Sequence, residues 1–338
     1  MAQLKPLLAP YQKSETRHSI LQLVNTLVPY ILLWILMIQA YRVSFWLTLP
    51  LIILAAGFLI RIFIFFHDCG HNSFFPSTTW NKRVGFWLGV LTFTPSEHWW
   101  HSHAIHHATS GNLDKRGTGD VTTLTLEEYY DRELLQRIGY RFFRNPLVMF
   151  GLGPFFMFFL MHRFAIPNYG KKQTMNVVWT NLAILAIAVG MSLLIGWQTY
   201  LVLQLAVMWL AGSAGIYMFY IQHQFEESYW ERNEKWNYVA SALLGASYYR
   251  LPKVLQWFTG SIGFHHIHHL SPRIPNYNLE KAHESIPEIK QWARVIPFGE
   301  GIKTVRYKVF NESQGKMVGF STASVRKEKV QPRDLSTS

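Results

Sequence analysis

The chain has 338 residues, of which 49% are hydrophobic and only 15% are charged, whereas about 25% of residues are charged in an average soluble domain. Aromatic residues make up 16%, so rings are as frequent as charges. This composition excludes a disordered chain, a collagen and a coiled coil, and it argues against an ordinary soluble enzyme. Because the mean hydropathy is only slightly positive, we expect a membrane core that carries a substantial polar portion.

The net charge is +12, from 32 Lys and Arg against 20 Asp and Glu. Nucleic-acid binding is one explanation of such a balance, but the sequence has no basic run and no RNA-binding signature, so we expect no nucleic-acid partner. A membrane protein accumulates Lys and Arg on its cytoplasmic side, and this explanation is favoured. The one cysteine, Cys69, excludes an intrachain disulfide.

Four apolar stretches are long enough to cross a membrane, which takes about 20 helical residues. They form two pairs joined by very short turns, and they cover residues 20–40, 44–66, 177–196 and 200–221. We therefore expect an all-α integral membrane protein with four transmembrane helices in two hairpins. Residues 1–19 form a polar cytoplasmic N-terminus, residues 20–310 a single domain, and residues 311–338 a mobile C-terminal tail.

Two shorter apolar stretches lie between the hairpins, at residues 84–95 and 147–161. The first is too short to span a membrane, and the second contains Gly151, Gly153 and Pro154. We expect both segments to lie in the membrane interface under a polar cap. The alternative, that one of them is a fifth span, stays open.

Four crossings place both termini, residues 67–176 and residues 222–338 on the same side of the membrane. Of the 32 Lys and Arg, only Arg42, in an outer turn, and Arg61, in the second span, do not lie on this side. The positive-inside rule makes that side cytoplasmic. We expect a multi-pass protein of the cell membrane with cytoplasmic N- and C-termini and a cytoplasmic helical cap.

Histidines cluster in three stretches of this cap, at residues 67–71, 101–107 and 265–269. Residues three and four positions apart share one face of a helix. That spacing groups His67 with His71, and it is repeated in two triplets: His103, His106, His107 and His265, His268, His269. Neutral imidazole suits Fe, Zn, Cu and Ni. Eight histidines exceed the four ligands that a zinc ion usually takes, so the spacing predicts two metals.

A ninth candidate ligand is His223, which directly follows the fourth span at the same membrane face. Isolated histidines such as His18, His162 and His283 are expected to be structural, and His98, His101 and His266 are expected to be structural or to support the ligands. Four acidic residues could fix a histidine tautomer: Asp68, Asp114, Asp120 and Glu226. Each of them could equally be a helix cap or an ion-pair partner.

At these residues the sequence resembles the membrane fatty-acid desaturase family. That family carries one H-x(3-4)-H box and two H-x-x-H-H boxes in this order, after a second and a fourth transmembrane helix. The resemblance covers about residues 20–310. The runs at residues 103–120 and 263–272 look closest to bacterial phospholipid (acyl-lipid) desaturases of the delta-5 type. The resemblance implies an enzyme that introduces a cis double bond, at the delta-5 position, into saturated acyl chains of membrane phospholipids.

The resemblance also implies a non-haem di-iron centre that uses O2 and two electrons. Carried over to this chain, its iron ligands are the eight box histidines, and His223 matches an additional histidine after the fourth helix. Some relatives place an Asn one turn before that histidine where this chain has Phe219, so no ligand is assigned there. An unactivated methylene cannot be attacked by side-chain acids and bases, so the hard step belongs to a metal–oxygen species.

Electrons must come from a separate donor, because the chain has no His-Pro-Gly-Gly haem motif, no cysteine cluster and no G-x-G-x-x-G fingerprint. The resemblance implies ferredoxin or flavodoxin, and an acidic donor would be attracted to the basic face. The nearest alternative function is a di-iron fatty-acid or alkane hydroxylase, or a ketolase, with the same boxes. A metal transporter or sensor is disfavoured, since the four spans hold almost no ionisable residue apart from Arg61.

Overall fold

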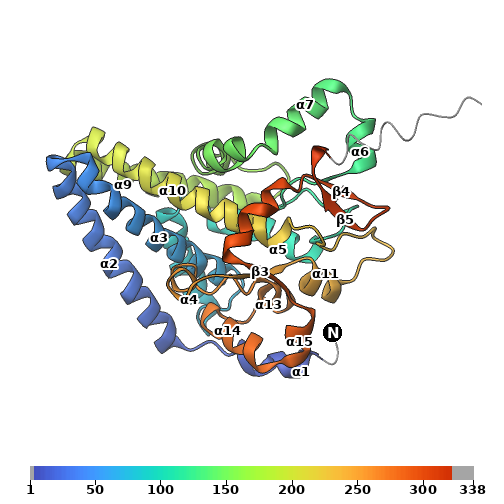
Figure 1. Cartoon of the computed structure of the whole chain (residues 1–338). Coiled ribbons are helices and arrows are strands. Elements are labelled where there is room, and N and C mark those ends of the chain that lie inside the picture. The colour runs from blue at the N-terminus through green and yellow to red at the C-terminus, as the bar shows by residue number, and fades with distance from the viewer. Residues whose placement is uncertain (1–3, 322–338) are drawn as a thin grey trace, which may run out of the picture.

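Four long helices dominate the computed structural model, which describes residues 4–321. They are α2 (Thr16–Val43), α3 (Phe45–Gly70), α9 (Lys171–Ile195) and α10 (Trp197–His223). All four are long and apolar enough to cross a membrane. They extend together from one side of a cap built of short helices and strands (Figure 1). This arrangement confirms the prediction of a mostly helical membrane protein with four spans.

Each long helix extends beyond the apolar stretch that predicted it. Helix α3 continues past the predicted end at Phe66 to Gly70, so His67 lies inside the helix and not after it. Helix α9 begins at Lys171 instead of residue 177. Hydropathy detects only the part of a helix that lies in hydrocarbon, whereas the backbone hydrogen bonds continue into the polar cap.

The turns within the two hairpins are each a single residue long. Ser44 separates α2 from α3, and its side-chain oxygen accepts a hydrogen bond from the Trp46 amide at 3.2 Å, which caps α3. Gly196 separates α9 from α10 and has a φ of +85°, a left-handed conformation that favours glycine. These turns hold each pair of spans antiparallel.

The cap contains short α-helices, 3-10 turns and two π-helical segments. The α-helices are α1 (Leu4–Leu8), α4 (Thr78–Leu91), α5 (Ser96–Thr109), α6 (Leu126–Asp131), α7 (Leu134–Phe143), α8 (Gly153–Phe155), α11 (Tyr238–Leu244), α12 (Lys253–Phe258), α13 (His265–Leu270), α14 (Asn276–Ser285) and α15 (Pro287–Trp292). The 3-10 segments are η1 (Ala9–Gln12), η4 (Met161–Arg163) and η5 (Phe298–Arg306). The π-helical segments are η2 (Leu147–Leu152) and η3 (Phe156–Leu160).

Five short strands in the cap accompany the predicted helices. The strands are β1 (Leu124–Thr125), β2 (Ser247–Arg250), β3 (Arg294–Pro297), β4 (Val309–Asn311) and β5 (Lys316–Val318). Strand β4 pairs in parallel with β1 and antiparallel with β5, and β2 pairs in parallel with β3. These strand pairs satisfy the backbone hydrogen-bonding groups of connecting segments that are far apart in sequence. Local periodicity does not reveal which distant segments pair in this way.

The same strands correct the predicted start of the C-terminal tail. Residues 311–318 were assigned to the tail, but they form the hairpin of β4 and β5, and Met317 is buried against Phe310 and Trp230. The interrupted apolar pattern reflected a turn and not the end of the fold. Residues 322–338 of the predicted tail lie outside the described residues.

One bent segment, Leu134–Phe143 followed by Leu147–Arg163, is apolar enough to be a fifth span, with a bend of 59°. Its second half, Leu147–Arg163, is fixed to the cap by residues just before and just after it. Arg144 donates to Gln224 Oε1 at 2.7 Å, and Ile166 N donates to His98 Nε2 at 3.1 Å. The segment therefore enters and leaves the membrane on the same side, which favours the interfacial position expected for it.

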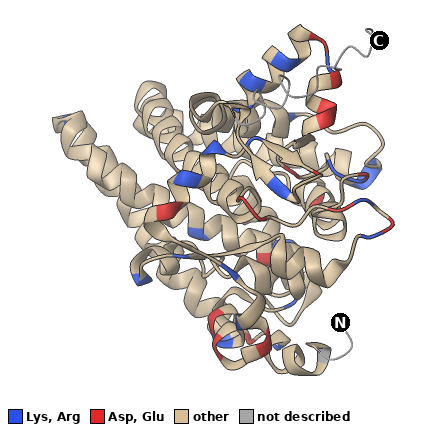
Figure 2. Ribbon diagram, turned by 45° about the vertical axis from the view of Figure 1, so that its right-hand side comes forward, with Lys and Arg blue, Asp and Glu red and all other residues tan. Residues whose placement is uncertain are grey.

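Charged residues gather on the cap, and the long helices carry none along most of their length (Figure 2). Arg61 is the exception inside α3, and it turns towards the cap. Its Nε donates to Thr26 Oγ1 at 3.1 Å, and its guanidinium lies 4.0 Å from the ring centre of Trp257 in α12. Such a stacked arginine anchors a cap helix to the membrane helices.

Candidate metal centre

Four helices carry the predicted site residues into the cap at the ends of α3 and α10. His67 lies in the last turn of α3, and His71 is the residue that follows that helix. Helix α5 carries the second box and α13 the third, and His223 is the last residue of α10. The structure brings all nine predicted histidines into one buried assembly, in two adjacent groups.

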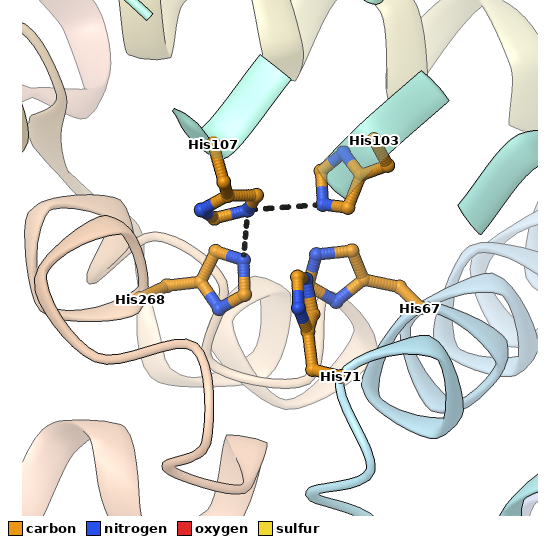
Figure 3. Close-up of side chains that lie close together, drawn as sticks. All are labelled: His67, His71, His103, His107 and His268. Carbon is orange, nitrogen blue, oxygen red and sulfur yellow. Dashed lines mark hydrogen bonds between the residues drawn. The ribbon is translucent and has the colours of Figure 1, made fainter. Parts of the chain in front are cut away.

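The first group contains five histidines, His67, His71, His103, His107 and His268, each of which offers one nitrogen within 4.8 Å of all the others. Their side chains converge from α3, α5 and α13 (Figure 3). His107 Nε2 lies 3.1 Å from His103 Nε2 and 3.0 Å from His268 Nε2. The imidazoles thus surround one point.

The second group contains His106, His223 and His269, with the same mutual limit of 4.8 Å. His106 Nε2 lies 3.3 Å from His223 Nε2. His265 is not within that limit of every member, but its Nε2 lies 2.9 Å from His223 Nε2 and 3.1 Å from His269 Nε2. The stacked rings of His107 and His269, with centres 4.2 Å apart, join the two groups.

Burial favours the neutral form of seven of these histidines, His71, His103, His107, His223, His265, His268 and His269. It lowers the pKa of His103, His107, His268 and His269 well below the usual range for histidine, and the neighbouring imidazoles lower it further because they would repel a second charge. A neutral imidazole retains the lone pair that binds a metal. The protein therefore holds the ligand form of these side chains at neutral pH.

The donor set fits a pair of metal ions. Within the described residues, His71 Nε2 is buried and has no hydrogen-bond partner, and His107 Nε2 lies within 3.1 Å of the Nε2 atoms of both His103 and His268. A buried polar atom without a partner is costly, and lone pairs that face one another repel. A cation at the centre of each group would satisfy the inward-facing nitrogens. The two groups thus match a two-metal site.

Carboxylates orient two of the histidines from outside. His67 Nδ1 lies 3.1 Å from Asp68 Oδ1, and Asp68 Oδ2 accepts hydrogen bonds from Asn276 N at 2.8 Å and Nδ2 at 2.9 Å. His106 Nδ1 contacts Asp120 Oδ1. These contacts leave Nε2 of each ring free to face the centre, which is how outer partners set the tautomer of a metal-binding histidine.

The other two acidic candidates lie elsewhere. Asp114 pairs with Arg232 at 2.8 Å, and Glu226 accepts a hydrogen bond from the Tyr307 hydroxyl at 2.8 Å. Two partners of the site were missed from the sequence. Asn276 supports Asp68, and the Gly245 carbonyl lies 3.2 Å from His223 Nδ1. Neither carries a motif, and a backbone carbonyl has no sequence signal at all.

Aromatic residues wall the site. The ring of Trp99 stacks on His103 with centres 4.4 Å apart. Phe219, to which no ligand role was assigned, packs against His106 at 5.2 Å and against His223 at 5.0 Å. Trp99 thus provides the first group with an apolar side, and Phe219 does the same for the second group. Both rings also separate the groups from water and hold the imidazoles in place.

The remaining histidines stay outside both groups. His98 accepts a backbone hydrogen bond, and the ring of His101 lies against Tyr169. His266 Nε2 lies 3.0 Å from His283 Nδ1 in a buried pair. His18 stacks on Tyr277, and His162 is buried beside Phe158. These placements agree with the structural roles expected for them.

Residues 44–296 match the protein family described as fatty acid desaturase. The chain is 46% identical to the fatty acid desaturase of Bacillus subtilis over 318 residues, which cover 94% of this chain and 90% of the relative. It is 28% identical over 271 residues to an sn-1 acyl-lipid omega-3 desaturase (ferredoxin) of Nostoc, with 72% and 68% covered. An sn-1 oleoyl-lipid 12-desaturase of Picosynechococcus is 28% identical over 252 residues, with 72% and 70% covered.

Proposed function

Because the chain belongs to the fatty acid desaturase family, we propose that it introduces a cis double bond into saturated acyl chains of membrane phospholipids. The observation that carries the proposal is the pair of adjacent histidine groups at the cap-side ends of the spans. That position lets an acyl chain reach the centre from the membrane. The names of the Nostoc and Picosynechococcus relatives support an acyl-lipid substrate.

The ligands of two iron ions are proposed to be nine histidines. The first iron is held by His67, His71, His103, His107 and His268, and the second by His106, His223, His269 and His265. When bound, the irons supply the reduction of O2 that removal of hydrogen from an unactivated methylene requires. The reaction removes one hydrogen from each of two adjacent methylenes to form the double bond, and with two electrons and two protons it reduces O2 to two waters.

The protein's own contribution is to bind, orient and exclude water. Asp68 and Asp120 fix the tautomers of His67 and His106, and buried rings such as Trp99 and Phe219 keep water from the centre. A dry site protects a reactive centre from side reactions. The buried neutral imidazoles add no negative charge to the metals, which leaves their positive charge available for the reaction.

Double-bond position is the finer part of the proposal. The delta-5 position is supported by the extended sequence runs around the second and third boxes, at residues 103–120 and 263–272. A di-iron hydroxylase remains the alternative function, because the same histidine arrangement serves both chemistries. The two are distinguished by their products and not by the site.

Expression in a host with saturated acyl chains is expected to yield new monounsaturated fatty acids only in the presence of O2. Gas chromatography–mass spectrometry of derivatised methyl esters measures the products and locates the double bond. A double bond between carbons 5 and 6 supports the delta-5 position. A double bond at any other position would contradict delta-5 but would still support desaturation. Hydroxylated products without unsaturated ones would contradict the desaturase function.

The electron donor is proposed to be a separate acidic protein, ferredoxin or flavodoxin. The net charge of +12 gathers on the cap, and opposite charges speed the encounter of two proteins. The name of the Nostoc relative includes ferredoxin, which supports the first of the two donors. The donor would deliver the two electrons one at a time from outside the chain.

The cap and both termini are proposed to lie in the cytoplasm, on the basis of the positive-inside rule. Cys69 is buried, so single cysteines can be placed at exposed positions without a background label. In intact cells, a membrane-impermeant maleimide is expected to label Gln198→Cys, in the turn region between α9 and α10, and not Lys281→Cys in α14. Permeabilised cells should label both. Labelling of Lys281→Cys alone in intact cells would show that the cap lies outside the cell, opposite to the proposal.

A further inference from the structure

A second lipid-facing feature lies away from the histidines, on the surface between α4 and α9. It is a groove of about 720 Å³, within the size range of small-molecule sites. Phe86 and Trp87 of α4 form one wall, and Trp179 and Leu182 of α9 form the other. Both tryptophans are exposed, Trp87 by 59% and Trp179 by 58%. None of the lining residues belongs to either histidine group.

One end of the groove is polar, and the rest is apolar. Lys172, at the start of α9, donates to Glu97 Oε2 at 2.6 Å, and both residues line the groove. Because α9 begins at the cap, this ion pair lies at the level of the lipid head groups on the cap side. Tryptophan is enriched at that same level. The groove then descends along α9 to Ala183.

The length of the groove matches one leaflet. From Lys172 to Ala183 the helix rises about 16 Å at 1.5 Å per residue, and one leaflet contributes about 15 Å to a hydrocarbon core of 30 Å. The groove is therefore long enough for a single acyl chain that starts at the head-group level. Its apolar walls suit such a chain, and its polar end suits a head group.

The charges at the polar end select the head group. Lys172 offers an ammonium to a phosphate, and Glu97 offers a carboxylate to an amine. A zwitterionic phospholipid with a primary amine, such as phosphatidylethanolamine, complements both charges at once. Lys172 and Glu97 pair with each other, so an anionic head group without an amine that drew Lys172 away would leave the Glu97 carboxylate without a compensating partner. The charge pair thus disfavours phosphatidylglycerol.

We propose that this groove binds one amine-bearing zwitterionic phospholipid of the cap-side leaflet, at a site separate from the metal centre. The site has a direct structural link to the catalytic cap. Buried Asn176 lines the groove, its Oδ1 accepts from Glu97 N at 3.0 Å, and its Nδ2 donates to Ser96 Oγ at 3.1 Å. Ser96 and Glu97 begin α5, the helix that carries the second histidine box. The bound lipid therefore braces the start of α5.

Native mass spectrometry of the delipidated, iron-loaded protein tests the proposal without turnover, so its result is independent of the proposed reaction. Titration with phosphatidylethanolamine should show one lipid bound at least about fivefold more tightly than phosphatidylglycerol, the effect expected of one favourable charge near a membrane surface. Lys172→Glu should weaken phosphatidylethanolamine binding by a similar factor. Lys171→Glu, the same charge change on a neighbour outside the groove, should not.

A second pair of variants tests the apolar part of the groove. Ala183→Trp should fill the groove and abolish the bound lipid, whereas Ala186→Trp, at an exposed position that does not line it, should leave binding unchanged. Iron content and thermal unfolding confirm that each variant is folded. Equal binding of the two lipids by the wild-type protein would overturn the proposal. So would Lys172→Glu with unchanged binding, which decides the matter even if Ala183→Trp fails to fold.

Discussion

Replacement of His268 by alanine is expected to abolish desaturation and to release iron from the protein. His268 Nε2 lies 3.0 Å from His107 Nε2 inside the first group, and its ring is fully buried. Alanine removes one of five converging nitrogens and leaves a cavity in their place. Because loss of an outer partner of a metal ligand already costs about 10–100-fold, loss of the ligand itself should reduce turnover by at least about 100-fold.

The measurement combines product analysis by gas chromatography–mass spectrometry with iron content per chain. His101→Ala is the matched control, because His101 lies on α5 just before the second box but outside both groups, against Tyr169. The control should keep near-normal iron and turnover. If His268→Ala inserted in the membrane and retained near-normal values, His268 would have to be removed from the proposed ligand set.

The four spans and the membership of the histidine assembly could be predicted from the sequence because both depend on local spacing. Length and hydropathy decide whether a helix can span a membrane. Likewise, residues four apart on a helix must point in similar directions, so His103 and His107 had to share a centre. The structure confirms that pairing within the first group.

How the boxes divide between the two groups could not be predicted from spacing. Each residue advances about 100° around a helix, so His106 points away from its neighbour His107 and joins His223 and His269. His268 and His269 separate for the same reason. The i, i+3, i+4 pattern describes one face of a helix, whereas here that face lies between two centres and serves both.

The outer partners could be predicted only in part. Asp68 and Asp120 were two of four equal candidates, and the sequence had no means of separating them from Asp114, which pairs with an arginine instead. That choice depends on how segments distant in the chain meet. Asn276 reaches Asp68 only because α14 packs beside the end of α3, a contact between residues 208 positions apart.

Replacement of Asp120 by asparagine is expected to weaken the second metal site selectively. The Asp120 side chain is only 7% exposed, and its carboxylate contacts His106 Nδ1. Asparagine keeps the shape but removes the charge that holds a proton on Nδ1 and leaves Nε2 to bind the metal. Such changes cost about 10–100-fold in metal affinity. Since the first group does not include His106, its iron should be retained.

Titration with a chelator, followed by iron analysis, should therefore show one weakly held and one tightly held iron per chain in Asp120→Asn. Asp68→Asn should weaken the other iron, because Asp68 supports His67 of the first group. Asp114→Asn is the matched control, as Asp114 lies on the surface beside Arg232, and it should match the wild type. Unchanged chelator sensitivity in Asp120→Asn would show that the carboxylate does not position His106. Simultaneous loss of both irons would instead show that the two groups bind metal as one unit, joined through the stacked rings of His107 and His269.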